Sequence, residues 1–139
     1  MTPTLNGRWQ SRLFLMGTLG FIVTLFFVIA FESIAPLIIL FLVMLFGFGW
    51  DIVYTLVQKW RWDHDWPPIF QLTAGIWEAI FIGFLIFATP FLGPLIGPGP
   101  QLWQFVLHYS AVWLAVFAGS QSLMRLVFPR WRYNGGQWI

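Results

Sequence analysis

The basic residues of this chain fall into three short clusters, and long apolar stretches with almost no charge separate these clusters. They are Arg8 and Arg12 near the start, Lys59 and Arg61 in the middle, and Arg125, Arg130 and Arg132 near the end. About 20 predominantly apolar residues are enough for a helix to cross the hydrocarbon core of a bilayer. Each stretch between clusters has room for two such segments, so the spacing of charge predicts a membrane-spanning helical protein.

The composition leaves no room for a separate soluble domain. Of 139 residues, 59% are hydrophobic and only 9% are charged, whereas a soluble domain carries about 25% charged residues. We therefore predict a single membrane domain over residues 1–139. The chain has no cysteine, which excludes disulfides, thiolate metal ligands and thiol nucleophiles. Its basic residues lie at segment ends, where they indicate orientation rather than nucleic-acid binding.

The apolar runs predict an all-α integral membrane protein with four transmembrane helices in an antiparallel bundle. The expected spans cover residues 13–31, 34–57, 69–92 and 101–128. Short polar or Gly/Pro-rich segments separate them, and we expect residues 93–100 to form a non-helical turn. The first run is longer than the apolar core of a signal peptide, about 7–15 residues, so we expect a retained helix. Residues 130–139 are expected to form a frayed tail.

The distribution of charge predicts the orientation of these spans. Four crossings place both termini and the connector of residues 58–68 on one side, and that side holds every lysine and arginine. The other side holds Glu32 and no basic residue. Cytoplasmic loops carry the excess of basic residues in membrane proteins. We therefore expect both termini in the cytoplasm, with most tryptophans near the membrane surfaces as an aromatic belt.

Small residues recur at a spacing of four on two of the expected helices. They are Gly75, Ala79 and Gly83 on the third span, and Ala111, Ala115 and Gly119 on the fourth. Such residues let helix backbones approach closely in a membrane. We expect the third and fourth spans to pack along these stripes, or the stripes to contact another chain. The first span is bulky and rich in phenylalanine, so we expect it to face lipid or a partner subunit.

Two carboxylates lie inside the expected spans. At about 1.5 Å per residue, Glu78 is about 14 Å deep and Asp51 is about 10 Å deep. Helical spacing and depth group them with other polar residues in the cytoplasmic half, and the expected cluster is Asp51, Thr55, Gln71, Glu78, Ser122 and Arg125. Intramembrane carboxylates often mark ion or proton pathways. The alternative is structural, with Glu78 bonded to Ser122 or a backbone carbonyl and Asp51 paired with Arg125.

Other candidate ligands are weaker. His108 could bind haem iron or chlorophyll magnesium, but the chain's second histidine, His64, lies in the connector on the opposite side. A hydrogen bond from His108 to Gln104 or a carbonyl is the commoner arrangement. The run Asp63-His64-Asp65 offers three ligand types, yet consecutive residues rarely converge on one ion, so we expect no metal site.

The connector itself is rich in tryptophan and arginine. Its candidate docking residues are Trp60, Arg61, Trp62 and Trp66, because aromatic and arginine side chains are favoured anchors at protein interfaces. The structural alternative is a rigid loop anchored at the membrane surface.

No catalytic motif accompanies these residues, so we predict a protein that is not an enzyme. The favoured function is a small non-catalytic membrane subunit, either an accessory or assembly component of a larger complex or a homo-oligomer. The alternative is a small oligomeric proton- or cation-coupled transporter or channel that uses Glu78 and Asp51. The expected partners are lipid and other membrane subunits or further copies of the chain, without nucleic acid.

Overall fold

The computed structural model describes residues 2–138, and all the regular structure within that range is helical. The elements are α1 (Leu5–Leu15), the π-helix η1 (Met16–Gly20), α2 (Phe21–Ala30), α3 (Ala35–Trp60), α4 (Pro68–Phe87), α5 (Gly93–Ile96), α6 (Leu102–Gln121) and α7 (Leu123–Val127). Four helical segments are long and apolar enough to cross a membrane: Leu5–Ala30, Ala35–Trp60, Pro68–Phe87 and Leu102–Val127. The predicted all-helical architecture with four candidate spans is thus confirmed.

The first span begins well before the residue where hydropathy placed it. Its N-cap is Thr4, whose hydroxyl accepts a hydrogen bond from the Gly7 amide at 3.1 Å. A capping side chain of this kind satisfies one of the free amides of the first helical turn. Several of the residues that follow the cap are polar, so a search for apolar runs does not detect this start of the helix. As a result Arg8 and Arg12, expected in a leading segment, lie on the first helix.

Two other boundaries also differ from expectation. The third span ends at Phe87 rather than Leu92. The segment expected to be non-helical contains the single-turn helix α5, with Pro94 at its start. Proline is tolerated in a first helical turn because its missing N–H has no partner there. The expectation for residues 93–100 was therefore wrong over Gly93–Ile96.

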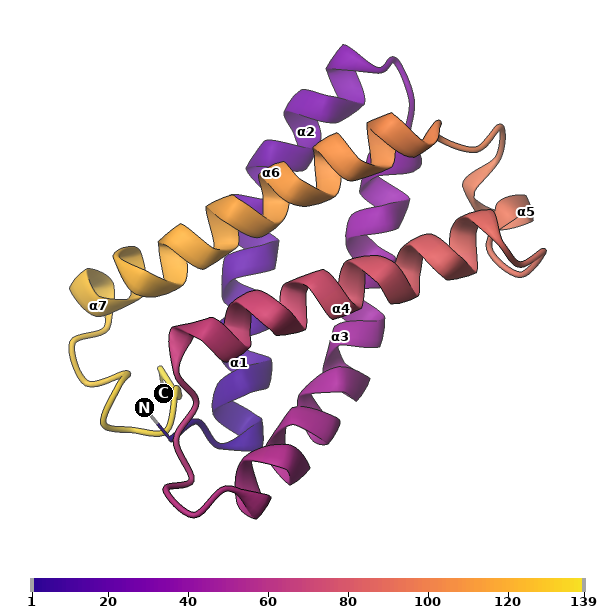
Figure 1. The fold of residues 1–139 in the computed structure, drawn as a ribbon. Coiled ribbons are helices and arrows are strands. Elements are labelled where there is room, and N and C mark those ends of the chain that lie inside the picture. The colour runs from indigo at the N-terminus through magenta and orange to yellow at the C-terminus, as the bar shows by residue number, and fades with distance from the viewer. Residues whose placement is uncertain (1, 139) are drawn as a thin grey trace.

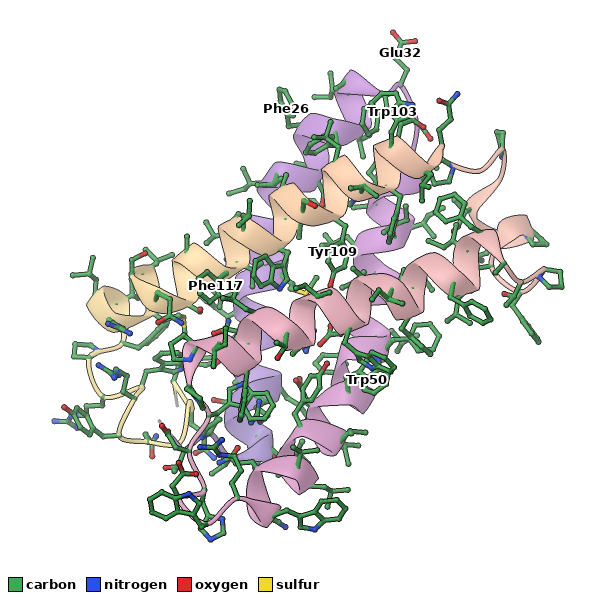
Figure 2. All side chains as sticks on the ribbon, viewed as in Figure 1. Phe26, Glu32, Trp50, Trp103, Tyr109 and Phe117 are labelled. Atoms are coloured by element: carbon green, nitrogen blue, oxygen red, sulfur yellow. The ribbon has the colours of Figure 1, made fainter. Side chains whose placement is uncertain are left out.

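The four spans form two crossing pairs. In Figure 1, α4 and α6 pass in front of α3 and the first span, which consists of α1, η1 and α2. The first span contacts both α3 and α6, and its residues Leu15 and Met16 are buried. The expectation that this span is peripheral was wrong for its inner face. Its outer face does carry exposed side chains, including Phe26, which projects from the bundle in Figure 2.

The two termini lie side by side at one end of the bundle, as Figure 1 shows. The amide of Thr4 donates a 2.8 Å hydrogen bond to the carbonyl of Gly135. Glu32 lies at the far end of the molecule (Figure 2), in the turn between the first span and α3. This arrangement is what an even number of crossings requires.

The small-residue stripes pack differently from expectation. The helices α4 and α6 are in contact, but a Cβ at Gly75 would collide with the Trp113 indole and one at Gly83 would meet Phe105. A Cβ at Gly119 would collide with Leu19 of the first span. The glycines are recesses that receive large side chains, because a missing Cβ leaves room for a ring or a branched chain. Stripe-to-stripe contact was therefore the wrong mode of packing, and Ala79, Ala111 and Ala115 are only half-buried.

Candidate functional site

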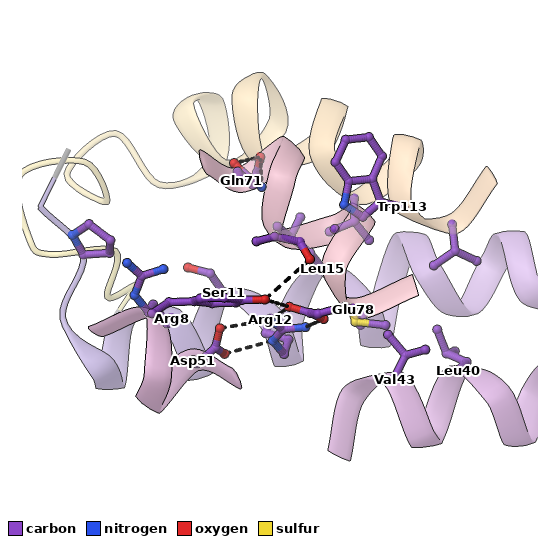
Figure 3. A pocket seen from close by; sticks show the side chains of 18 of the residues that line it. Arg8, Ser11, Arg12, Leu15, Leu40, Val43, Asp51, Gln71, Glu78 and Trp113 are labelled. Atoms are coloured by element: carbon purple, nitrogen blue, oxygen red, sulfur yellow. Dashed lines mark hydrogen bonds and ion pairs between the residues drawn. The ribbon is translucent and has the colours of Figure 1, made fainter. Parts of the chain in front are cut away.

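A single arginine holds both carboxylates of the candidate spans. The Arg12 Nε and Nη2 atoms donate to the two Asp51 oxygens, each at 2.9 Å. Nη1 and Nη2 donate to the two Glu78 oxygens at 3.0 and 2.9 Å. Asp51 and Glu78 are only 4% and 5% exposed. Figure 3 shows the guanidinium between the two carboxylates, and we call this group the Arg12–Asp51–Glu78 triad.

The triad joins three different spans, since its members lie on α1, α3 and α4. On α3, Gly47 lies one turn before Asp51, and a Cβ there would collide with the Arg12 guanidinium. The Tyr54 hydroxyl, almost one turn after Asp51, donates to Glu78 Oε1 at 3.1 Å. This face of α3 thus provides room for the guanidinium at Gly47, a carboxylate at Asp51 and a further hydrogen-bond donor at Tyr54. A buried ion pair needs such additional hydrogen bonds to offset its loss of hydration.

Several predicted members of the polar cluster lie elsewhere. Arg125 is exposed and donates to Gln121 at 2.9 Å, so the expected Asp51–Arg125 pair was wrong. Ser122 is exposed and donates to the Ala118 carbonyl, so it does not contact Glu78. The cause is a break at Ser122, with φ −119° and ψ −68°, between α6 and α7.

The two remaining members make local contacts. Gln71 bonds with Ser120 of α6, its Nε2 donating to the Ser120 Oγ at 3.0 Å. Thr55 donates to the backbone carbonyl of Asp51 at 2.7 Å, rather than to either carboxylate. The structure places Asp51 and Glu78 close together, as predicted, whereas the other members of the expected cluster contact neither carboxylate group.

Arg8 lies one helical turn before Arg12, on the same side of α1, as Figure 3 shows. Its Nη2 donates to Gln58 Oε1 at 2.7 Å, and its guanidinium lies 4.3 Å from the centre of the Trp66 ring. Stacking of this kind is a favourable cation–π contact. Together with the triad it makes a set of two positive and two negative side chains, which balances formal charge at the site.

A cavity of about 170 Å³ adjoins the triad. Side chains from all four spans line it, and the lining changes from polar near the termini to apolar farther in. Arg8, Ser11 and Gln71 lie toward the terminal end in Figure 3, with Leu40 and Val43 beyond the triad. The cavity therefore has a charge-balanced middle and an apolar inner part.

The C-terminal segment borders the terminal end of the cavity. We call residues 129–138 the C-terminal strap. Trp131 is buried, lines the cavity and donates through Nε1 to Ser11 Oγ at 2.8 Å. Ser11 in turn donates to the Gly136 carbonyl at 2.9 Å. The frayed tail expected from the sequence is thus, in its described part, a fold that contacts α1.

His108 lies near the inner part of the cavity and is 2% exposed. Its Nε2 and the Thr24 hydroxyl form a 2.9 Å hydrogen bond that joins α6 to α2. Gln104, its expected partner, instead accepts from the Gln101 amide. Nδ1 of His108 is buried and has no hydrogen-bond partner among residues 2–138.

His108 and the cavity that it lines bear on whether the chain can hold a metal or a cofactor. The structure contains no group of three or more metal-ligating side chains within residues 2–138. A cavity of about 150 Å³ accommodates one benzene molecule. The whole cavity, about 170 Å³, therefore has room for about one small ring and is too small for the haem or chlorophyll macrocycle considered from the sequence.

The connector between α3 and α4 is a compact, charged turn. Arg61 donates to both Asp63 oxygens, at 2.9 and 2.6 Å, and this hydrogen-bonded cation lowers the pKa of Asp63 to about 2. Trp60 and Trp62 are 88% and 92% exposed, whereas Trp66 is half-buried beneath Arg8. Of the four candidate docking residues, two tryptophans project freely and two side chains are engaged within the chain.

No protein-family model matches the chain, and the searches of curated proteins and of solved structures likewise find no match. The site geometry and the sequence are therefore the basis for assigning a function.

Proposed function

We propose that this chain is a small non-catalytic membrane protein that acts as a subunit or assembly component, with both termini in the cytoplasm. The observation that carries the proposal is the engagement of both intramembrane carboxylates by Arg12. All four carboxylate oxygens of Asp51 and Glu78 accept hydrogen bonds from that one guanidinium. This supports a structural tie between three helices.

The triad also weighs against a cation pathway in this conformation. A carboxylate that carries a cation or proton must offer a free oxygen to it, and Glu78 additionally accepts from Tyr54. Uptake would first require separation of a buried, four-bonded ion pair. Breaking such a pair by removing one partner costs about 3–5 kcal/mol.

The outer surface supports an assembly role. Large apolar side chains are exposed on every candidate span, for example Phe26, Phe41, Phe84 and Leu114. Lipid covers such surfaces, and so do neighbouring membrane helices. The basic residues and the paired termini at one end of the bundle support the cytoplasmic orientation.

A second candidate is proton- or cation-coupled transport. One observation favours it, which is that the cavity reaches Asp51 and Glu78 from the terminal end. Transport would use a conformation in which Arg12 leaves one carboxylate. The two candidates predict different behaviour in purified form, so one set of samples distinguishes them.

The experiment purifies the protein in a mild detergent for native mass spectrometry and reconstitutes the same sample for proton and alkali-cation flux. We expect a stoichiometric partner or a defined homo-oligomer, and no flux above empty vesicles. The control is a charge-neutral triple variant, Arg12→Gln with Asp51→Asn and Glu78→Gln, which should keep the assembly. A lone monomer would contradict the subunit role. A flux that Glu78→Gln abolishes would establish transport instead.

A further inference from the structure

We propose that the inner part of the cavity is a binding site for an uncharged, single-ring carbonyl compound, whose carbonyl oxygen accepts a hydrogen bond from His108 Nδ1. The site is distinct from the triad and does not depend on the subunit role. Three observations carry it: the unpartnered nitrogen, the local hydrogen-bond pattern of Thr24, and the size and charge of the cavity.

The nitrogen is the strongest of these observations. His108 is 2% exposed, lines the cavity and is without a partner at Nδ1 in the described range 2–138. A buried polar atom left without a hydrogen bond costs about 1–3 kcal/mol. On a residue that lines a cavity, such an atom can be satisfied by a ligand atom of the opposite hydrogen-bonding type.

Thr24 indicates which type that is. Three other threonines within the spans or at their ends, Thr18, Thr55 and Thr89, each donate to the carbonyl four residues earlier. Thr24 makes no such bond in the described chain, and its hydroxyl contacts Nε2 of His108 instead. The Thr24 proton is therefore available for Nε2, which then acts as the acceptor.

This assignment fixes the role of the other ring nitrogen. A neutral imidazole has one donor and one acceptor nitrogen. With Nε2 accepting from Thr24, Nδ1 carries the N–H and needs an acceptor. The carbonyl oxygen of a ligand is such an acceptor, whereas a hydrocarbon has no acceptor atom.

The cavity limits the rest of the ligand. The volume of the whole cavity, about 170 Å³, is close to the roughly 150 Å³ that holds one benzene ring, so the ligand is no larger than a small ring. Leu40, Val43 and Val112 line it together with the aromatic rings of Tyr109 and Trp113; Figure 2 shows Tyr109 between α6 and α4.

Charge excludes ionic ligands. Arg8 and the triad together carry two positive and two negative charges, so an ion entering the cavity would be buried without a free counter-charge. Burying an unpaired charge is far more costly than burying a hydrogen-bonded neutral group. The ligand that fits this site is therefore uncharged.

The test compares two probes of nearly the same size and shape, cyclohexanone and methylenecyclohexane, which differ in having a carbonyl oxygen or a CH₂ group at the same position. Binding is measured by thermal-shift titration of the purified full chain. We expect saturable binding of cyclohexanone, up to ~10-fold tighter than methylenecyclohexane, as one hydrogen bond provides. Equal affinity for the two probes, or no saturable binding of cyclohexanone, would overturn the proposal.

A matched pair of variants tests the nitrogen. His108→Gln places an amide where Nε2 lies, so it should keep the Thr24 contact and lose up to ~10-fold in cyclohexanone affinity. His108→Asn places its amide near Nδ1, so it should keep cyclohexanone binding while the protein becomes less stable. The reverse pattern would refute the assignment.

A measurement on the wild-type chain keeps the test independent of how these variants fold. Nitrogen-15 NMR of labelled histidine reports which ring nitrogen carries the proton, and His64, which is exposed, is the only other histidine. We expect the Nδ1–H tautomer for His108. Observation of the Nε2–H tautomer would remove the donor and overturn the proposal.

Discussion

At the scale of single residues, Arg12 has the largest structural consequence. It contacts two carboxylates that are almost fully buried, and the contact joins three helices. The energetics of such a group are asymmetric. Removing the cation leaves two buried negative charges without a partner. Neutralising all three residues of the triad instead leaves polar groups that can form hydrogen bonds with one another.

We therefore predict that Arg12→Gln lowers the free energy of unfolding by about 3–5 kcal/mol. The charge-neutral triple variant should recover most of this loss. Unfolding in detergent, followed by circular dichroism against denaturant, measures both. Arg125→Gln is the control, because Arg125 is exposed and bonded only to Gln121 within the described structure, and its effect should stay within about 0.5 kcal/mol. Equal effects of Arg12→Gln and Arg125→Gln would contradict the prediction.

Gly75 gives a second prediction at this scale. A methyl group there would collide with the indole of Trp113, and overpacking of a filled site costs about 1–3 kcal/mol. Gly75→Ala should therefore lower the unfolding midpoint, and adding Trp113→Leu should restore part of it.

The matched control is Gly49→Ala on α3, where a Cβ meets nothing within 4 Å. Alanine is favoured over glycine in a helix by about 1 kcal/mol, so this variant should raise the midpoint or leave it unchanged. Shifts of the same sign and size at Gly75 and Gly49 would show that the indole does not occupy the recess.

At the scale of elements, the C-terminal strap is held by backbone geometry as much as by Trp131. Gly135 and Gly136 have φ of 61° and 84°, a region that costs other residues about 1–2 kcal/mol. A Cβ on Gly135 would also lie 2.7 Å from the Thr4 methyl group. Both effects act on the point where the strap meets the first helix.

Gly135→Ala should therefore loosen the strap without altering the spans. Hydrogen–deuterium exchange of peptides from residues 130–138 measures this, and we expect exchange to become ~10-fold faster because local opening follows local stability. The Thr4 amide, which donates to Gly135, should exchange faster as well. Gly93→Ala, with open space at its Cβ, serves as the control. Unchanged exchange in the strap would show that it is held elsewhere.

The comparison of elements with the sequence shows what hydropathy can and cannot predict. The four spans were predictable because transfer of many apolar side chains adds up over a helix length. The start of the first helix was not, since it rests on the Thr4 cap and on polar residues that an apolar window rejects. Arg12 was therefore placed before the first span, at a segment end where it indicates orientation.

The site shows the same limit more sharply. The proximity of Asp51 and Glu78 followed from their places on antiparallel neighbours. Their partner did not, because Arg12 becomes available only when the first helix packs against α3 and α4. The sequence contained one indication of this partner. Arg12 directly precedes an apolar run, and an arginine in that position is the nearest cation to a buried carboxylate on an adjacent span. The break at Ser122 that moves Arg125 away has no such signal in its composition.

At the scale of the whole molecule, the positions of the termini and of Glu32 both fit the topology expected for four crossings. The termini are joined by the Thr4–Gly135 hydrogen bond at one end, and Glu32 lies at the other (Figure 1, Figure 2). All lysines and arginines belong to segments that begin or end near the joined termini. By the positive-inside rule, we expect this end of the bundle to face the cytoplasm.

The absence of cysteine allows this topology to be tested with single-cysteine variants at exposed positions. His64→Cys and Tyr133→Cys lie at the terminal end, and Glu32→Cys and Pro98→Cys lie at the opposite end. Because basic segments are retained in the cytoplasm, a membrane-impermeant maleimide should label the second pair in intact cells and the first pair only in inverted vesicles. Labelling of His64→Cys and Tyr133→Cys from opposite faces would contradict the paired termini, and labelling of both from outside would reverse the orientation. Lys59→Gln with Arg61→Gln removes two of the basic residues, and we expect it to increase the fraction of inverted molecules.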